Sequence, residues 1–435
     1  MQTIYALSSG ALPAGVAIVR ISGPACREVM QDLCGTIAAD RLATLRTIRR
    51  RNGAILDTGI VLFFSGPASF TGEDCLELHL HGGRAVVSAL LDELSGFTGL
   101  RHAEPGEFSR RAFQNGKLDL VQVEGLADLI AAETEMQRRL ALEHADGGQS
   151  AIYAGWAKRL THARAMIEAE IDFADEDDVP GSVSNQIWPD MALLRSEIQQ
   201  HVQKAPIGEI IRDGLKVVIS GAPNVGKSSL INALAKRNVA IVTDIAGTTR
   251  DVLSVDLDLD GFAVRVYDTA GLRDTDEVVE VEGIRRARTV IAQADLVLLL
   301  TDGRPDAEDL SLEAFRSKTI RIRSKIDINR GAESGTIGIS TETGEGLDQL
   351  IAAIRAYLSD TVSSAALSIP TRQRHIDNLT SATAYIDMCL AAEGEGLDIQ
   401  TEYLRLAGRE LGRITGQVDV EQLLDVIFSQ FCIGK

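Results

Sequence analysis

The sequence has little positive charge and few cysteines, and it has no long apolar run. Its 44 lysines and arginines face 62 aspartates and glutamates, which gives a formal net charge of -18. A general nucleic-acid-binding protein is basic, so this balance disfavours that class, although it permits a local basic patch. No run of about 18 uncharged apolar residues occurs, so no segment is expected to cross a membrane. The first residues carry no basic segment before their apolar stretch and do not resemble a signal peptide.

The cysteines are an odd number, are widely spaced and include no C-x-x-C motif. This usage favours a reducing compartment and disfavours both a disulfide framework and a zinc site. The five cysteines are Cys26, Cys34, Cys75, Cys389 and Cys432.

Cys432 lies in the closing segment FSQFCIGK. Prenylation is not expected there, because Gly434 is not aliphatic, Lys435 is an atypical last residue and no polybasic run precedes them. A chemical role in an active site that includes the terminus and a structural role as a small buried residue both stay open. The reactivity of the thiol depends on a pKa that the sequence does not reveal.

The chain is long enough for about two to four domains. GVAIVRISG and GIVLFF predict strands in the first part, and apolar residues at helical spacing predict one long helix over 152–171. LKVVIS, a hairpin turning at Asp260-Gly261 and ADLVLLLTDG predict an α/β sheet, followed by helices. We therefore expect an α/β domain inserted between two helical stretches that pack together. The expected boundaries are 1–117, 118–213, 214–358 and 359–435.

The segment GAPNVGKSSL fits the pattern G-x-x-x-x-G-K-[ST] from Gly221 to Ser228. An expected strand precedes it and an expected helix follows it, and this context separates a P-loop from a chance match. Its glycines permit a tight turn, after which backbone N–H groups point into one concavity that binds phosphates. We expect Lys227 to contact the β- and γ-phosphates and Ser228 to bind Mg²⁺.

Four further segments predict that the nucleotide is GTP. DTAG, which begins at Asp268, follows a strand and can hold Mg²⁺ through water and sense the γ-phosphate. DIAGTTRD lies where a GTPase carries its switch threonine. SKID ends in Asp327, whose carboxylate can accept two N–H bonds from guanine and finds no matching donors in adenine. ISTETGEG resembles the last base-contacting loop. The expected GTP-binding residues are Asn224, Val225, Gly226, Lys227, Ser228, Ser229, Thr243, Asp244, Ile245, Ala246, Gly247, Thr248, Thr249, Asp268, Thr269, Ala270, Gly271, Ser324, Lys325, Ile326, Asp327, Ser340, Thr341 and Glu342.

The GTPase motifs depart from the usual pattern at three places. Ser324 stands where Asn or Thr is usual, and its shorter side chain predicts weaker nucleotide affinity. Thr341 and Glu342 replace the usual Ala and Lys or Arg, a change that a backbone contact to the base tolerates. Leu272 stands where Ras-type enzymes carry a water-orienting Gln, so another device is needed from the chain or a partner.

Taken together, the motifs resemble the MnmE (TrmE) family of tRNA modification GTPases. Besides the GTPase motifs, the resemblance rests on SFTGEDCLELHLHGG, PGEFSRRAFQNGKLDLVQVEGLADLI and ITGQVDVEQLLDVIFSQFCIGK. It covers essentially the whole chain. It implies a multidomain protein: an α+β folate-binding N-terminal domain, a discontinuous helical domain and an inserted Ras-like P-loop GTPase domain.

The resemblance also implies a function. Members of the family act with a FAD-containing flavoprotein, MnmG, in a heterotetramer. Together they install a carboxymethylaminomethyl or aminomethyl group on C5 of the wobble uridine of certain tRNAs. The one-carbon unit is bound as a folate, such as 5-formyltetrahydrofolate, and homodimers form through the N-terminal domains. The family is cytoplasmic and not bound to membranes.

The resemblance assigns folate contacts to Arg20, Glu77, Lys117 and Lys435. Two cations suit the glutamate carboxylates of a folate, and a carboxylate suits the donor-rich edge of its pterin. Without the resemblance, Arg20 reads as an ion-pair partner, Glu77 as a strand-face charge and Lys117 as a surface residue.

In the GTPase domain, the resemblance implies a potassium site that takes the place of an arginine finger. It also gives Mg²⁺ a second ligand, Thr249 beside Ser228, and assigns the orientation of the attacking water to Glu280. Cys432 is a candidate catalytic thiol. The potassium ligands implied are Asn224, Thr243, Ile245 and Thr248.

Two other functions compete with this one. A GTP-switched assembly factor that binds ribosomal RNA without modifying it shares the GTPase motifs, but such proteins usually carry a basic domain. A folate-binding aminomethyltransferase leaves the GTPase insertion unexplained. The arginine-rich segment RLATLRTIRRRNG, which begins at Arg41, is as compatible with a solvated edge as with phosphate contact.

Overall fold

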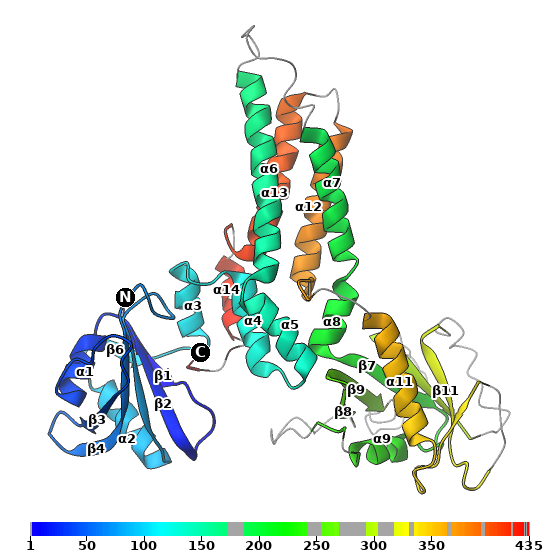
Figure 1. Ribbon diagram of the computed structural model, residues 1–435, viewed down its shortest axis with the longest axis horizontal. Helices are drawn as coiled ribbons and strands as arrows, with labels where there is room; N and C mark the ends of the chain where they lie inside the picture. Colours follow the sequence, from blue (N-terminus) through cyan, green and yellow to red (C-terminus); the bar gives the residue numbers. More distant parts are fainter. Residues whose placement is uncertain are drawn as a thin grey trace, which may run out of the picture. The chain divides into compact units, whose positions relative to one another are not determined.

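The computed structural model is shown in Figure 1. The chain forms two compact units. One takes in residues 1–127, 144–187 and 384–435, and the other takes in 128–143 and 188–383. The structure describes residues 2–172, 187–237, 239–241, 254–268, 293–302, 317–329, 335–362, 367–392, 396–418, 421–429, 431 and 433–434.

A mixed β-sheet forms the N-terminal part of the first unit, with the strand order β3-β4-β5-β2-β1-β6. Strands β1 and β6 are parallel, and the other neighbours are antiparallel. Along much of β2 and β5, every second residue is buried, because one face of these strands packs against α1 and α2. The strands are β1 (Thr3–Leu7), β2 (Ala14–Ser22), β3 (Thr44–Arg49), β4 (Ile55–Phe64), β5 (Cys75–Gly82) and β6 (Leu100–His102); the helices are α1 (Cys26–Cys34) and α2 (Arg84–Ser95).

Helices complete the first unit. The long helix α6 packs along α13, so a helix that precedes the inserted sheet meets one that follows it, as the sequence predicted (Figure 1). The buried side chains of α6 include Trp156, Leu160, Ala163 and Ile167, which belong to the predicted apolar stripe. The helices are α3 (Glu107–Gln114), α4 (Leu120–Ala131), α6 (Gly148–Asp172), α13 (Leu397–Thr415) and α14 (Glu421–Ser429). Helix α5 (Glu135–Ala145) and the last residues of α4 lie mostly in the second unit.

The second unit contains the predicted α/β sheet, with the strand order β12-β11-β10-β7-β9-β8. All neighbours are parallel except β8 and β9, which form the predicted hairpin. Its turn residues Asp260 and Gly261 have φ values of 56° and 87°, the left-handed conformation that a type I′ turn requires. The strands are β7 (Leu215–Gly221), β8 (Ser254–Leu259), β9 (Phe262–Asp268), β10 (Leu296–Thr301), β11 (Thr319–Arg323) and β12 (Ile337–Gly338).

The core of this sheet consists of apolar strand residues such as Val217, Ile219 and Leu298, all fully buried. Near-continuous apolar strands are typical of a parallel sheet covered on both faces. None of the described helices is both long and apolar enough to cross a membrane. The helices of this unit are α7 (Ile187–Val202), α8 (Ala205–Asp213), α9 (Lys227–Ala235), α11 (Leu347–Val362) and α12 (Gln373–Ala391), the last of which continues into the first unit.

Candidate functional site

The P-loop joins β7 to α9 at the centre of the second sheet. Neighbouring strands β10 and β9 lie on opposite sides of β7, and ligands of open α/β sheets bind at such a position. Asn224 and Gly226 have φ values of 63° and 107°, which turns the loop backbone into a concave cradle. Gly221 must lack a side chain, because a Cβ there would collide with the carbonyl oxygen of Leu300.

Two side chains of the P-loop are already placed for phosphate and metal chemistry. Lys227 is buried, and its ammonium donates to the carbonyl oxygens of Gly221 and Ala222 at 2.8 and 2.9 Å. The Ser228 hydroxyl donates to Oδ2 of Asp268 at 2.7 Å, and Asp268 is fully buried at the end of β9. The structure therefore brings the P-loop together with the first residue of DTAG. A hydroxyl beside a carboxylate is a donor set that suits Mg²⁺.

The predicted guanine-reading segment lies directly after β11 and contacts the P-loop. The Ser324 hydroxyl donates to the carbonyl oxygen of Val225 at 2.6 Å, and Lys325 Nζ donates to that of Asn224 at 2.8 Å. Ser324 is thus a buried support for the P-loop, a role in which its short side chain suffices. Asp327 is exposed, and Ser340 is buried in the following loop, where its hydroxyl accepts from the N–H of Thr343.

Several predicted site residues lie outside the described residues. They belong to the switch loop, the rest of DTAG, the water-orienting segment and the C-terminus. They are Thr243, Asp244, Ile245, Ala246, Gly247, Thr248, Thr249, Thr269, Ala270, Gly271, Glu280, Cys432 and Lys435. Their predicted roles stay predictions.

A second candidate site lies in the N-terminal sheet, far along the chain from the P-loop. It is a cavity of about 420 Å³, and the three described residues predicted to contact folate, Arg20, Glu77 and Lys117, all line it. Its size falls within the roughly 300–1,000 Å³ of small-molecule sites. The complete lining is Arg20, Arg41, Phe64, Ala68, Ser69, Phe70, Cys75, Glu77 and Lys117.

Arg20 and Glu77 are partners of each other in this cavity. They face each other across β2 and β5, and the Nε and Nη2 atoms of Arg20 each lie 2.9 Å from Oε1 of Glu77. The other oxygen of Glu77, Oε2, is 3.2 Å from Nε2 of His79. The charge of Arg20 is thus paired with Glu77 in this structure, and its predicted contact with folate stays a prediction. The Arg20 guanidinium also lies 5.4 Å from the ring centre of Phe70.

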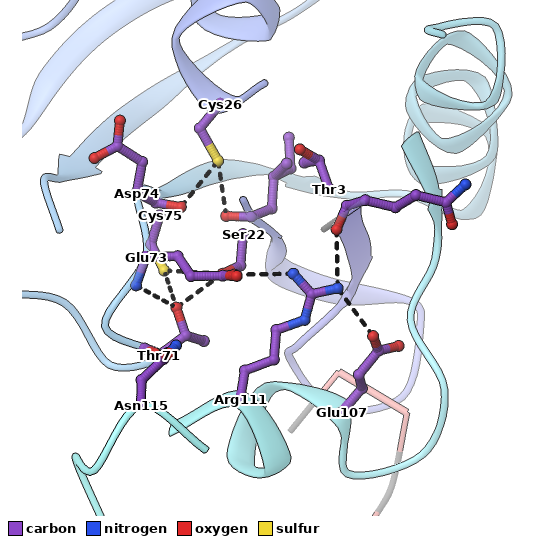
Figure 2. A network of polar contacts seen from close by, with 12 residues as sticks. Thr3, Ser22, Cys26, Thr71, Glu73, Asp74, Cys75, Glu107, Arg111 and Asn115 are labelled. Atoms are coloured by element: carbon purple, nitrogen blue, oxygen red, sulfur yellow. Dashed lines mark hydrogen bonds and ion pairs between the residues drawn. The ribbon is translucent and has the colours of Figure 1, made fainter. Parts of the chain in front are cut away.

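Buried polar contacts fix the loop between β4 and β5, which supplies three cavity residues (Figure 2). Arg111, on α3, donates to Glu73 Oε2 at 2.9 Å and to Glu107 Oε1 at 3.0 Å. Asn115 donates to the Thr71 carbonyl at 2.7 Å. Burial alone would raise the pKa of Glu107, but hydrogen bonds from Arg101, the Glu104 N–H and Arg111 hold it below its ordinary value. These buried contacts hold α3 against the loop.

Several cavity residues carry no signal in the sequence that marks them as ligand contacts. In the sequence, Arg41 is only one member of an arginine-rich segment. Two other members of that segment pair with Glu93 instead: Arg50 Nη1 lies 4.0 Å from its Oε2, and Arg51 Nε lies 2.9 Å from its Oε1. The aromatic residues Phe64 and Phe70 carried no signal, because an aromatic in a strand or loop is ordinary core material. Only the fold shows that they surround one cavity.

The described part of the C-terminal segment contacts the N-terminal sheet. The Ser8 hydroxyl donates to the carbonyl oxygen of Gly434 at 2.8 Å, and Ile433 forms a β-bridge with Pro105. Gly434 has a φ of 101°, and a Cβ there would collide with the carbonyl oxygen of Leu7. The chain end is therefore anchored beside the end of β1.

Comparison with known proteins covers both candidate sites. A family model described as "GTP-binding protein TrmE N-terminus" matches residues 3–117, and one described as "MnmE helical domain" matches residues 120–432. The tRNA modification GTPase MnmE of Sinorhizobium medicae is 64% identical, over 100% of this chain and 99% of its own. That of Rhizobium meliloti is 63% identical, with the same coverage. Among solved structures, the G domain of the FeoB iron transporter of T. maritima is 27% identical over 33% of this chain and 98% of its own, with a TM-score of 0.26.

Proposed function

This chain belongs to the MnmE family of tRNA modification GTPases, and we propose that it works with a FAD-containing, MnmG-like partner on the wobble uridine of certain tRNAs. It is a GTP-binding and GTP-hydrolysing enzyme of tRNA modification. The product of the proposed reaction is a carboxymethylaminomethyl or aminomethyl group at C5 of that uridine. One observation carries the proposal: a tRNA modification GTPase MnmE is 64% identical to this chain, and the similarity covers the whole chain and therefore both candidate sites. This favours modification over the alternative of an RNA-binding assembly factor.

The N-terminal cavity is the proposed site of a reduced folate such as 5-formyltetrahydrofolate. The rings of Phe64 and Phe70 offer apolar surface to a flat heterocycle, and Glu77 offers carboxylate oxygen to a donor-rich edge. Lys117 and Arg41 offer positive charge to carboxylates. Lys435 is proposed as a further contact on the family resemblance alone. A bound folate would supply the one-carbon unit, while the residues of this chain bind and orient it.

The described P-loop residues fit a magnesium-bound nucleotide. The Ser228 hydroxyl, next to the Asp268 carboxylate, is the proposed Mg²⁺ ligand, together with Thr249. Bound Mg²⁺ would neutralise charge on the phosphates. Lys227 now binds two loop carbonyls, and these are weak partners that a phosphate oxygen replaces favourably.

Potassium is the proposed substitute for an arginine finger. The proposed ligands are Asn224, Thr243, Ile245 and Thr248, and Glu280 is proposed to orient the attacking water. Support comes from the sequence, in which Leu272 stands at the place of the usual Gln and leaves that role to another group.

The wider organisation is also proposed. The domains run over 1–117, 118–213, 214–358 and 359–435, and the protein forms a homodimer through its N-terminal domains. Two partner subunits would complete a heterotetramer that acts on tRNA. The cysteines are odd in number and widely spaced, which disfavours a disulfide framework. This usage supports a cytoplasmic location, where thiols stay reduced.

Cys432 is the proposed catalytic thiol of the C-terminal segment. Its neighbours Phe431 and Ile433 both contact other parts of the first unit: Phe431 belongs to an apolar cluster with Leu120 of α4, and Ile433 forms a β-bridge with Pro105. These contacts of the neighbouring residues support a role beyond packing.

The experiment that tests the proposed function is mass analysis of wobble uridines in tRNA from cells that lack this protein. We expect the modified nucleosides to disappear and to return with the wild-type gene. Unchanged nucleosides, together with a defect in ribosome assembly, would favour the assembly factor instead.

A further inference from the structure

Two cations of the N-terminal cavity converge on a single turn of the chain. The Lys117 ammonium donates to the carbonyl oxygen of Pro67 at 3.1 Å. The Arg41 guanidinium donates, through Nη2, to the carbonyl oxygen of the next residue, Ala68. The two acceptors are consecutive residues, so both cations contact the same turn of the chain.

The third cation, Arg20, belongs to a different part of the lining. It is bound to Glu77 on the adjacent strand and forms no part of the pair at Pro67 and Ala68. The cavity lining therefore has one ion pair, Arg20 with Glu77, and two further cations, Arg41 and Lys117, which have no carboxylate partner among the lining residues.

The charge of the lining differs from that of the whole chain. The lining contains three cations, Arg20, Arg41 and Lys117, and one carboxylate, Glu77, so its formal charge is three minus one, or plus two. The chain as a whole carries -18. A positive cavity in an acidic protein attracts anions selectively, because low-dielectric walls focus the field.

Local structure holds Arg41 toward the cavity. Its backbone has a φ of 58°, and its N–H donates to the carbonyl oxygen of Phe63 at 2.8 Å. The guanidinium lies 5.7 Å from the ring centre of Phe64, another lining residue. Asp40 Oδ2 is 3.6 Å from Arg41 Nε, while the other Asp40 oxygen accepts from the N–H and hydroxyl of Ser65. Asp40 is thus an ion-pair partner of Arg41, but it does not line the cavity.

We propose that Arg41 and Lys117 together hold the dicarboxylate tail of the folate, and that Arg41 is a specificity-determining residue of this site. The inference rests on the proposed binding of folate. A carboxylate forms stronger, charge-assisted bonds than the backbone carbonyls that the two cations now contact. Two cations that contact one turn of the chain suit the two carboxylates of one glutamate, and the Arg20–Glu77 pair is left for the heterocycle.

The test compares two ligands that differ only in the tail. Calorimetric titration of the full-length protein uses 5-formyltetrahydrofolate and 5-formyltetrahydropteroate, which lacks the glutamate. We expect the wild-type protein to prefer the folate. Arg41→Gln should lower folate affinity about tenfold or more, the value of a lost charge-assisted bond, and should leave pteroate affinity unchanged. Lys117→Gln should do the same.

Two control variants show whether a change in affinity is specific to the glutamate tail of the ligand. Arg49→Gln removes an exposed arginine of β3 that does not line the cavity, and both affinities should stay at the wild-type value. Arg20→Gln breaks the pair with Glu77 and should weaken the two ligands by the same factor. Melting temperatures of all variants show whether the fold is kept.

The outcomes distinguish this inference from the proposed function. If the wild-type protein binds neither ligand, the folate site is wrong and the inference fails with it. If the wild-type protein binds folate but Arg41→Gln weakens both ligands equally or neither, the inference alone is overturned. If Arg41→Gln does not fold, the wild-type protein still decides: added sodium chloride must weaken folate binding more than pteroate binding, and equal weakening contradicts the proposal.

Discussion

The Ser228 hydroxyl donates a 2.7 Å hydrogen bond to Asp268, which connects the first turn of α9 to the end of β9. The two residues come from the P-loop and from DTAG, motifs that are separated by about 40 residues in the sequence. Their contact places the hydroxyl that is proposed to bind Mg²⁺. It also makes Asp268 the group that orients the proposed metal ligand.

Asp268→Asn tests this arrangement. The amide keeps the size of the carboxylate but loses its charge and one acceptor oxygen, so Mg²⁺-dependent GTP hydrolysis should fall by about 10–100-fold, as when an outer-shell partner is lost. The measurement is steady-state hydrolysis against Mg²⁺ concentration. Asp348→Asn, an exposed carboxylate that pairs with Arg237, is the control and should leave hydrolysis unchanged. Wild-type kinetics in the Asp268 variant would show that Asp268 has no part in the metal site.

Potassium dependence tests the proposed replacement of the arginine finger. Hydrolysis should be faster in potassium than in sodium, because the loop sets the size of the ion that fits; a finger-like charge is worth about 10³–10⁵ in rate. Asn224→Ala should remove the difference between the two salts. Glu280→Ala should lower turnover while GTP binding stays near normal. Equal wild-type rates in both salts would rule the mechanism out.

The C-terminal anchor gives a third prediction. Gly434→Ala places a Cβ against the carbonyl oxygen of Leu7 in a left-handed backbone, so the terminal segment should detach. tRNA modification should be lost while GTP hydrolysis stays near normal, as expected also for Cys432→Ser. Gly155→Ala is the matched control: it lies inside α6 with open space around it, and alanine there favours the helix. Full modification by the Gly434 variant would show that the anchor is dispensable.

His201 gives a prediction about pH and stability. Burial, followed by the charges of Lys204 and His375, lowers the pKa of His201 from 6.5 to about 4. Between these values the unfolded chain binds a proton that the folded chain does not, so stability falls as pH drops from 6.5 toward 4. The full loss amounts to about 3 kcal/mol. Urea unfolding across this range should show a shallower pH dependence for His201→Gln. The same slope in both proteins would contradict the assignment.

Much of the fold followed from local patterns in the sequence. The turn at Asp260-Gly261, the buried strand LVLLLT of β10 and the long helix α6 were all predicted, because turn chemistry and periodicity are local properties. The P-loop was equally readable, since its residues are contiguous. Its relation to Asp268 and Ser324 followed from motif order, and the structure supplies the hydrogen bonds.

The N-terminal cavity was only partly predictable. Arg20, Glu77 and Lys117 were found through a family resemblance, but their pairing depends on strand register, which a single sequence does not state. The proposed role of Arg41 depends on its contact with Ala68, which lies 27 residues further along the chain. No local sequence pattern predicts such a contact. The support from Arg111 was missed for the same reason: a buried arginine is recognisable only once its carboxylate partners are in place.

The measurement that tests the account most directly is transfer of a labelled carbon. The purified protein, its proposed MnmG-like partner, substrate tRNA, GTP, and ammonium or glycine as the source of the amino nitrogen are combined with a folate that carries carbon-13 in its one-carbon unit. The wobble nucleoside is then analysed by mass spectrometry. The account predicts that the label appears in the C5 substituent of the wobble uridine, and that it is lost when GTP is omitted. A modified uridine without the label, or no modification in the complete mixture, would contradict it.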